Sequence, residues 1–237
     1  MKGRAMDLPA GIDPDRFELI TNQFFNKVTS AREQIDINKN VVDPFAAVIE
    51  AAASNLSMIE WVRAEVDRQL QKALSNHVGY YHQELIGLLP GWESTGTSGG
   101  NYDAIHRTPF QTNIGSYPVI AEVKNKHNTM NSSSTSKLRE NFISYLGRPE
   151  FKGYVAYLIQ IIPRPGRNTD IPWVVNRYGE WDKIRLIDAK TVYERSTQDP
   201  DALRKVFEAI PVVLSSKIDL SKWEHDLWRN LYGSSIY

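Results

Sequence analysis

The first ninety residues carry apolar side chains at the spacing of buried helix faces. Asp13 before Pro14 is a helix-start signal, because the proline is tolerated in the first helical turn and the aspartate can cap it. Asp43 before Pro44 repeats this signal ahead of an alanine-rich segment over residues 45–53. After the first signal, apolar residues recur every three or four positions and predict one amphipathic helix: Phe17, Ile20, Phe24, Val28, Ala31 and Ile35.

A third start signal lies at Ser57 and Glu60, which have the spacing of a capping box. It predicts a helix over residues 58–74. A separate helical segment follows over residues 80–89 and ends at Pro90.

The period of the pattern changes after a loop over residues 91–101 that is rich in Gly, Ser and Thr. Short runs of β-branched and aromatic residues then predict strands over residues 102–106, 117–124, 154–162, 173–175 and 184–187. A turn over residues 113–116 joins the first two strands. Helices are predicted over residues 137–145, 191–195 and 201–210, and the aromatic-rich segment SKWEHDLWRNLY lies near the end of the chain.

Helices followed by a mixed sheet predict an α/β (α+β) fold, with a mixed central β-sheet flanked by helices. The length of the chain, 237 residues, fits a single domain. We expect a helical N-terminal lobe over residues 1–90, and a mixed-sheet core with C-terminal helices over residues 91–237.

Composition narrows the classes of protein that the chain can be. Cysteine is absent, which excludes disulfides, cysteine nucleophiles, thiolate zinc sites and iron–sulfur clusters. No apolar run approaches the ~20 residues of a membrane-spanning helix, and residues 1–11 lack the apolar region of a signal peptide. We therefore expect a cytoplasmic protein without a membrane partner.

Charge is distributed unevenly along the chain. The 28 Lys and Arg balance the 28 Asp and Glu, so the net charge indicates no partner. Residues 101–169, however, contain nine basic and four acidic residues. This basic middle part favours a polyanionic ligand.

The chemistry of the chain centres on Asp103 and the tripeptide Glu122-Val123-Lys124. Residues two apart on a strand face the same side, so Glu122 and Lys124 project together. If Asp103 lies on a neighbouring antiparallel strand, its carboxylate comes close to Glu122. Two such carboxylates can hold Mg²⁺, and the lysine can position an attacking water. The alternative is a surface ion pair between Glu122 and Lys124.

This pattern resembles the signature of the PD-(D/E)XK nucleases, although tyrosine replaces proline before Asp103. The segment over residues 124–131, KNKHNTMN, resembles a family of type II restriction endonucleases, the AsuI-like enzymes that cut within GGNCC. Upstream segments are also similar to that family: Asp43-Pro44-Phe45, Glu60-Trp61, Tyr81-His82-Gln83 and Gly91-Trp92. The resemblance covers roughly residues 40–165.

The resemblance implies a catalytic role for each residue of the pattern. Asp103 and Glu122 become metal ligands, with the Val123 carbonyl a third, and Lys124 positions or activates water. Some restriction enzymes add an acidic residue from an N-terminal helix, and Glu84 lies on a suitable segment. A glutamate that faces solvent is the alternative for Glu84.

The polar residues after the tripeptide are candidates for DNA contacts. Asparagine can pair with adenine, and lysine or arginine usually reads guanine. The Asn and Ser residues can instead form a turn and a helix cap. The candidates are Asn125, Lys126, His127, Asn128 and Asn131.

The resemblance implies a homodimer that cuts both strands of double-stranded DNA at a short palindrome with Mg²⁺, and a cognate DNA methyltransferase in a bacterial or archaeal cell. A structure-selective or repair nuclease of the same fold is the first alternative. A non-catalytic DNA-binding protein is the second, and it would lack metal binding.

Overall fold

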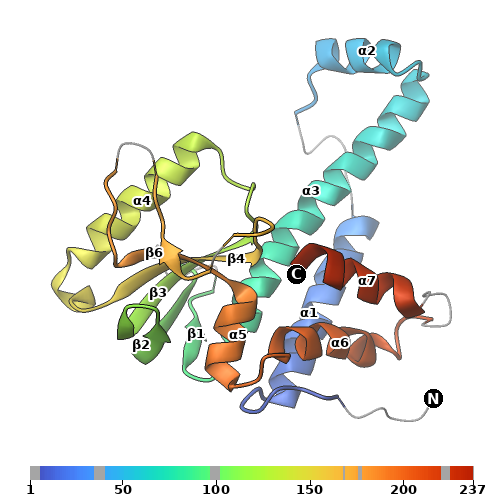
Figure 1. The fold of residues 1–237 in the computed structure, drawn as a ribbon. Helices are drawn as coiled ribbons and strands as arrows, with labels where there is room; N and C mark the ends of the chain where they lie inside the picture. The colour runs from blue at the N-terminus through green and yellow to red at the C-terminus, as the bar shows by residue number, and fades with distance from the viewer. Residues whose placement is uncertain are drawn as a thin grey trace. The chain divides into compact units, whose positions relative to one another are not determined.

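A computed structural model of the chain describes residues 6–34, 41–96, 102–167, 169–175, 178–219 and 225–236. In chain order the helices and strands are α1 (Pro14–Glu33), α2 (Pro44–Ala53), α3 (Met58–Ile86), β1 (Trp92–Ser94), β2 (Ala104–Thr112), β3 (Gly115–Lys126), α4 (Ser132–Leu146), a 3₁₀ turn (Pro149–Phe151), β4 (Val155–Ile162), β5 (Ile171–Pro172), β6 (Ile184–Asp188), α5 (Ala189–Thr197), α6 (Ala202–Leu214) and α7 (His225–Ile236) (Figure 1). The expected α/β architecture is confirmed.

The six strands form one mixed sheet in the order β1-β2-β3-β4-β6-β5. β3, β4 and β6 run parallel, whereas β1, β2 and β5 join them in antiparallel pairs. α4 covers one face, where Phe142 and Leu138 pack against Ile120, Leu158 and Ile184. α5 contacts β4 and β6, and Figure 1 shows it on the other side of the sheet from α4.

Three sequence predictions about these elements were wrong in detail. α3 is one helix where two were expected, because no proline interrupts the segment between them and a helix tolerates Gly79 at a cost of about 1 kcal/mol. The loop after Pro90 contains the short strand β1. Trp173 and Val175 bury their side chains beneath α4 without forming the expected strand, and β5 lies just before them.

The helix-start signals are confirmed in the structure. The Asp43 carboxylate accepts hydrogen bonds from the backbone N–H groups of Phe45 and Ala46 and so caps α2. The Glu60 carboxylate accepts from the Ser57 N–H at 2.8 Å, and Ser57 Oγ accepts from the Glu60 N–H. No single helix among the described residues is long and apolar enough to cross a membrane; α2 and α3, bent by 110°, pass that test only as a pair.

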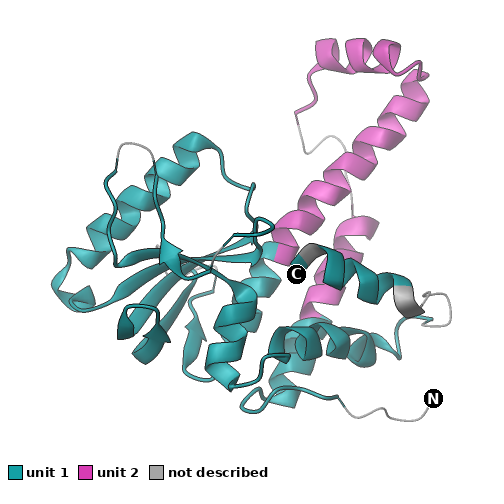
Figure 2. Ribbon diagram, in the orientation of Figure 1, with its two compact units in different colours: residues 1–22, 79–237 teal, residues 23–78 magenta. Residues whose placement is uncertain are grey.

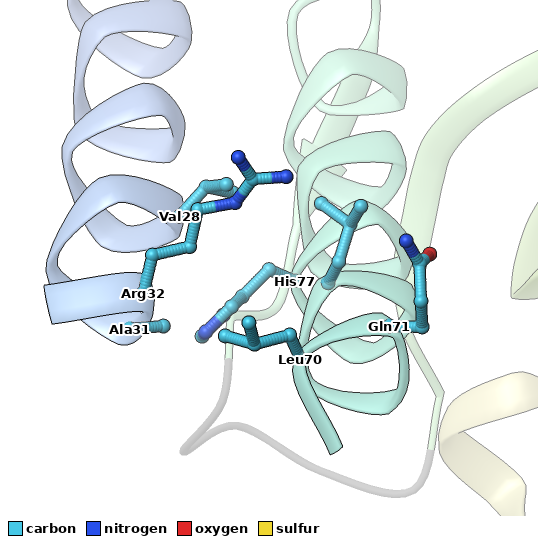
Figure 3. Close-up of a pocket in the computed structure, with 7 residues that line it drawn as sticks. Val28, Ala31, Arg32, Leu70, Gln71 and His77 are labelled. Carbon is cyan, nitrogen blue, oxygen red and sulfur yellow. The ribbon is translucent and has the colours of Figure 1, made fainter. Parts of the chain in front are cut away.

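The chain divides into two compact units (Figure 2). Unit 1 comprises Met1–Asn22 and Gly79–Tyr237 and contains the whole sheet, whereas unit 2 comprises Gln23–Val78. Inside unit 2, side chains of α1 and α3 leave a gap of about 10 Å³, the room of one water molecule. Figure 3 shows its lining from both helices, with Val28 and Ala31 on α1 and Leu70 and His77 on α3.

A buried carboxylate, Asp170, ties the sheet to α5 in unit 1. It is 1% exposed and accepts four hydrogen bonds, from Arg185 Nε (2.6 Å), Arg195 (2.6 Å), the Tyr157 hydroxyl (2.8 Å) and the Asn113 N–H (2.6 Å). Burial alone would raise the pKa of this carboxyl, but the hydrogen bonds from the two arginines and the tyrosine bring the pKa below its usual value.

We expect Asp170→Asn to lower the free energy of unfolding by about 3–5 kcal/mol, because it leaves two arginines without their buried counter-charge. Since the folded pKa is lowered, the contribution of Asp170 is present above the ordinary carboxyl value of 3.8 and is lost as the pH falls through the folded pKa. Urea unfolding at pH 7 measures the change. The exposed Asp182→Asn is the matched control, and equal stability of the two variants would contradict the role of Asp170.

Candidate active site

Asp103 and Glu122 lie opposite each other because of the register of the β2–β3 hairpin. Ala104 pairs with Ala121 in this antiparallel ladder, and the Asp103 N–H donates to the Ala121 carbonyl at 2.8 Å. The Asp103 carboxylate in turn accepts a hydrogen bond of 2.8 Å from the Val123 N–H. The hairpin therefore fixes both the backbone and the side chain of Asp103 beside Glu122.

Lys124 completes this group on the same face of β3. Its Nζ donates to Glu122 Oε1 at 2.5 Å, and the two side chains are 28% and 17% exposed. Val123, between them, points to the opposite side and is buried. The structure thus brings together Asp103, Glu122 and Lys124. It also contains the ion pair between Glu122 and Lys124 that the sequence analysis gave as the alternative to a catalytic role.

The electrostatics of the pair favour a bound cation. Burial raises the pKa of Asp103, and the charge of Glu122 raises it further, to about 6. The Val123 N–H, Lys124 and Gln83 lower this pKa but do not offset the rise. Lys124 offsets only one of the two carboxylates, and a divalent cation between them would offset the remaining negative charge.

The donor set fits Mg²⁺, which binds in proteins through one or two carboxylates together with waters and substrate phosphates. Over residues 6–34, 41–96, 102–167, 169–175, 178–219 and 225–236, no group of three or more His, Cys, Asp or Glu side chains is arranged to hold a metal ion. Asp103 and Glu122 would therefore need water or other oxygen ligands to complete the shell of an ion.

The last turns of α3 supply a site residue that the sequence did not indicate. The Gln83 side chain lies close enough to the Asp103 carboxylate to lower its pKa. Its neighbour Glu84, which was selected, is half-buried and accepts a hydrogen bond of 2.5 Å from Ser94 Oγ. One residue along a helix turns the side chain by about 100°, so Gln83 and Glu84 face different neighbours. A catalytic role for Glu84 stays a prediction.

Gln160 is a second site residue that the sequence did not indicate. It lies beside Lys124 in the parallel pairing of β3 and β4 and is 5% exposed. Its Oε1 has no hydrogen-bond partner among the described residues. The only signal in the sequence was one polar residue within the otherwise apolar strand VAYLIQII.

The candidate DNA contacts extend from the end of β3 into the turn before α4. Lys126, His127 and Asn128 are exposed, and Asn125 is half-buried. Asn131 caps α4, where its side chain accepts from the Ser134 N–H at 2.8 Å, so the helix-cap reading of this residue is confirmed. The role of all five in DNA binding stays a prediction.

Only some of the basic residues in the segment over residues 101–169 lie on the surface. Arg139, on the inner face of α4, is completely buried and donates to the carbonyl of Gly179 at 2.9 Å. His106, near the site in sequence, is also buried and packs between Trp92 and Phe110. The last part of the glycine-rich loop before Asp103, residues 97–101, lies outside the described residues.

Comparison with known proteins gives concordant matches. Residues 11–219 match the model of a family described as the Eco47II restriction endonuclease. The type II restriction enzyme Eco47II of Escherichia coli is 32% identical over 207 residues, which are 82% of each chain. The type II restriction enzyme Sau96I of Staphylococcus aureus is 29% identical over 225 residues, 89% of this chain and 80% of the relative.

Proposed function

Because the chain belongs to the Eco47II restriction endonuclease family, and is thus a type II restriction endonuclease, we propose that it hydrolyses both strands of double-stranded DNA at a GGNCC-like palindrome with Mg²⁺. The observation that carries the chemistry is the convergence of Asp103 and Glu122 with Lys124 at 2.5 Å from Glu122. The GGNCC site rests on the resemblance of residues 124–131 to the AsuI-like enzymes.

In this proposal Asp103 and Glu122 hold the metal ion, with the Val123 carbonyl as a further ligand. When bound, the ion activates water and offsets the charge that develops on the phosphate. The hairpin orients the Asp103 carboxylate before DNA arrives, because the Val123 N–H holds it in place. Glu84 keeps its proposed role as an additional acidic residue from α3.

Lys124 contributes a positive charge that the metal ion does not replace. In the structure it neutralises Glu122. With the Glu122 carboxylate committed to a metal ion, the Lys124 ammonium group would be free to donate to the attacking water or to a phosphate oxygen. Gln160, buried and paired in register with Lys124, has an open carbonyl oxygen that could accept from the lysine once the lysine is released from Glu122.

DNA recognition falls to the polar residues after Lys124. Asn125, Lys126, His127, Asn128 and Asn131 contact phosphates or base edges in this proposal. The exposed Lys126 extends from the same strand as the active site, so phosphate contact and chemistry share one rigid element. A palindromic site calls for a symmetric homodimer, and a cognate methyltransferase in the cytoplasm of a bacterial or archaeal host protects the host DNA.

A digest of unmethylated phage-length DNA with Mg²⁺ tests this function, with Asp103→Ala as the inactive control. We expect discrete fragments whose mapped ends share GGNCC. Fragments that share another palindrome would contradict the proposed site only. A smear that the control abolishes would indicate a structure-selective nuclease, and no cutting would contradict the catalytic proposal.

Gln83→Leu tests the contact between α3 and the metal ligands. Because partners that orient a ligand typically contribute 10–100-fold in metal affinity or activity, we expect the Mg²⁺ concentration for half-maximal cleavage to rise roughly 10-fold or more. Titration of Mg²⁺ at saturating DNA measures it. Gln71→Leu, on the unit 2 part of the same helix, is the control, and an equal Mg²⁺ requirement in both variants would contradict the role of Gln83.

A further inference from the structure

α2 is apolar on every side, although only one side is covered. Its ten residues, PFAAVIEAAA, include a single charged side chain, Glu50. Within unit 2, Ala47 and Ala51 pack against Trp61 of α3. A helix that is apolar all round is normally buried all round, and the described residues of a single chain leave the remaining face of α2 uncovered.

That remaining face carries large exposed side chains. Phe45, Val48 and Ile49 follow the helical spacing i, i+3, i+4, and they are 79%, 60% and 68% exposed. The first turns of α3 add three residues, Met58, Ile59 and Val62, at 50%, 68% and 40% exposure. We call these six residues the α2–α3 apolar surface.

The carboxylates nearest in sequence to this surface are held by local hydrogen bonds. The Trp61 indole N–H donates to Glu50 at 2.9 Å. The Ser57 hydroxyl and N–H both donate to Glu60 at 2.8 Å. Both carboxylates therefore already have hydrogen-bond donors within their own chain.

We propose that the α2–α3 apolar surface is the interface with a second copy of this chain. A large side chain offers roughly 150–200 Å², so six that are about 60% exposed present on the order of 600 Å². If all of this area were covered, two copies would bury on the order of 1,200 Å² of apolar surface, the lower end of the range of ~1,200–2,000 Å² for stable interfaces.

The choice of a second copy as the partner rests on the proposed function. Each chain carries one set of Asp103, Glu122 and Lys124, whereas cutting both strands of a palindrome takes two such sets. A two-fold contact uses the same patch on both chains, as a neutral apolar surface allows.

Ile49→Glu tests the interface directly, with Leu19→Glu as the matched control because Leu19 is a similarly exposed (56%) helical residue of unit 1. Analytical ultracentrifugation of the full chain without DNA should find a wild-type dimer. We expect Ile49→Glu to weaken it at least ~100-fold, because each dimer would bury two unpaired carboxylates. Leu19→Glu should leave the dimer unchanged, and circular dichroism should show that both variants fold.

Cross-linking gives an independent readout because the chain has no cysteine. A short bis-maleimide should join two chains that carry Ile59→Cys and should not join chains that carry Leu19→Cys. A monomeric wild type, a dimer that Ile49→Glu does not weaken, or binding of the surface to phospholipid vesicles without a dimer would each overturn the interface. None of these readouts depends on cleavage, so failure here is distinct from failure of the proposed chemistry.

Discussion

Lys124→Ala is expected to reduce single-turnover DNA cleavage by roughly 10²–10⁴-fold, the range of an acid–base or water-positioning group, while the affinity for DNA in Ca²⁺ stays close to that of the wild type. The reason is that Lys124 is half-buried beside Glu122 and, in the proposed mechanism, would act on the reacting atoms rather than on the DNA backbone at large. Quenched-flow cleavage and fluorescence anisotropy measure the two quantities separately.

Lys126→Ala is the matched control, because Lys126 lies on the same strand but is exposed. We expect the opposite result there: binding should weaken and the slope of log affinity against log salt should fall by about one, with near-normal cleavage of bound DNA. Near-normal cleavage by Lys124→Ala would contradict the assignment of the active site.

The second large effect is expected from Asp103→Asn, which should abolish cleavage and yet stabilise the metal-free protein. The pKa of Asp103 rises from 3.8 to about 6 on folding, so its ionised form costs roughly 2–3 kcal/mol of stability above pH 6. Asparagine removes the charge and still accepts the hydrogen bond from the Val123 N–H. Thermal unfolding in EDTA at pH 8 should therefore give a higher Tm for the variant.

The sign of the pH dependence follows from the direction of that shift. A raised carboxyl pKa means that the folded state holds the proton more tightly than the unfolded state. The neutral form stabilises the protein below about pH 4, and this contribution is lost as the pH rises through about 6. The Tm advantage of Asp103→Asn should accordingly vanish near pH 4. An advantage that is absent at pH 8 would contradict the electrostatic account of the site.

The sequence alone was sufficient to predict those contacts that join residues close together in the chain. The spacing of Glu122 and Lys124 on one strand, and the hairpin that returns the chain to Asp103, depend on β-strand periodicity and one turn. Helix caps at Asp43 and Ser57 likewise involve residues only two or three positions apart. Such contacts are encoded in short segments and can be read from them.

Contacts between distant segments were not predictable in this way. Gln83 comes close to the Asp103 carboxylate from a helix that ends before the sheet begins, and Gln160 is placed beside Lys124 only by the parallel pairing of β3 and β4. Arg139 carries the positive charge expected of a DNA-binding residue, but tertiary packing buries its side chain. The spacing of apolar residues along the chain does not predict these contacts, because each depends on which helices and strands become neighbours in the fold.

The most direct test of the central claim is thermal unfolding with and without Mg²⁺, in the absence of DNA. If Asp103 and Glu122 hold the ion only in the folded state, ten times Kd of Mg²⁺ should add about 1.4 kcal/mol and raise the Tm by roughly 3–6 °C. Asp103→Ala and Glu122→Ala should lose this rise, whereas Lys124→Ala should keep it. An equal Mg²⁺-induced rise in all four proteins, or no rise in the wild type, would contradict the metal site.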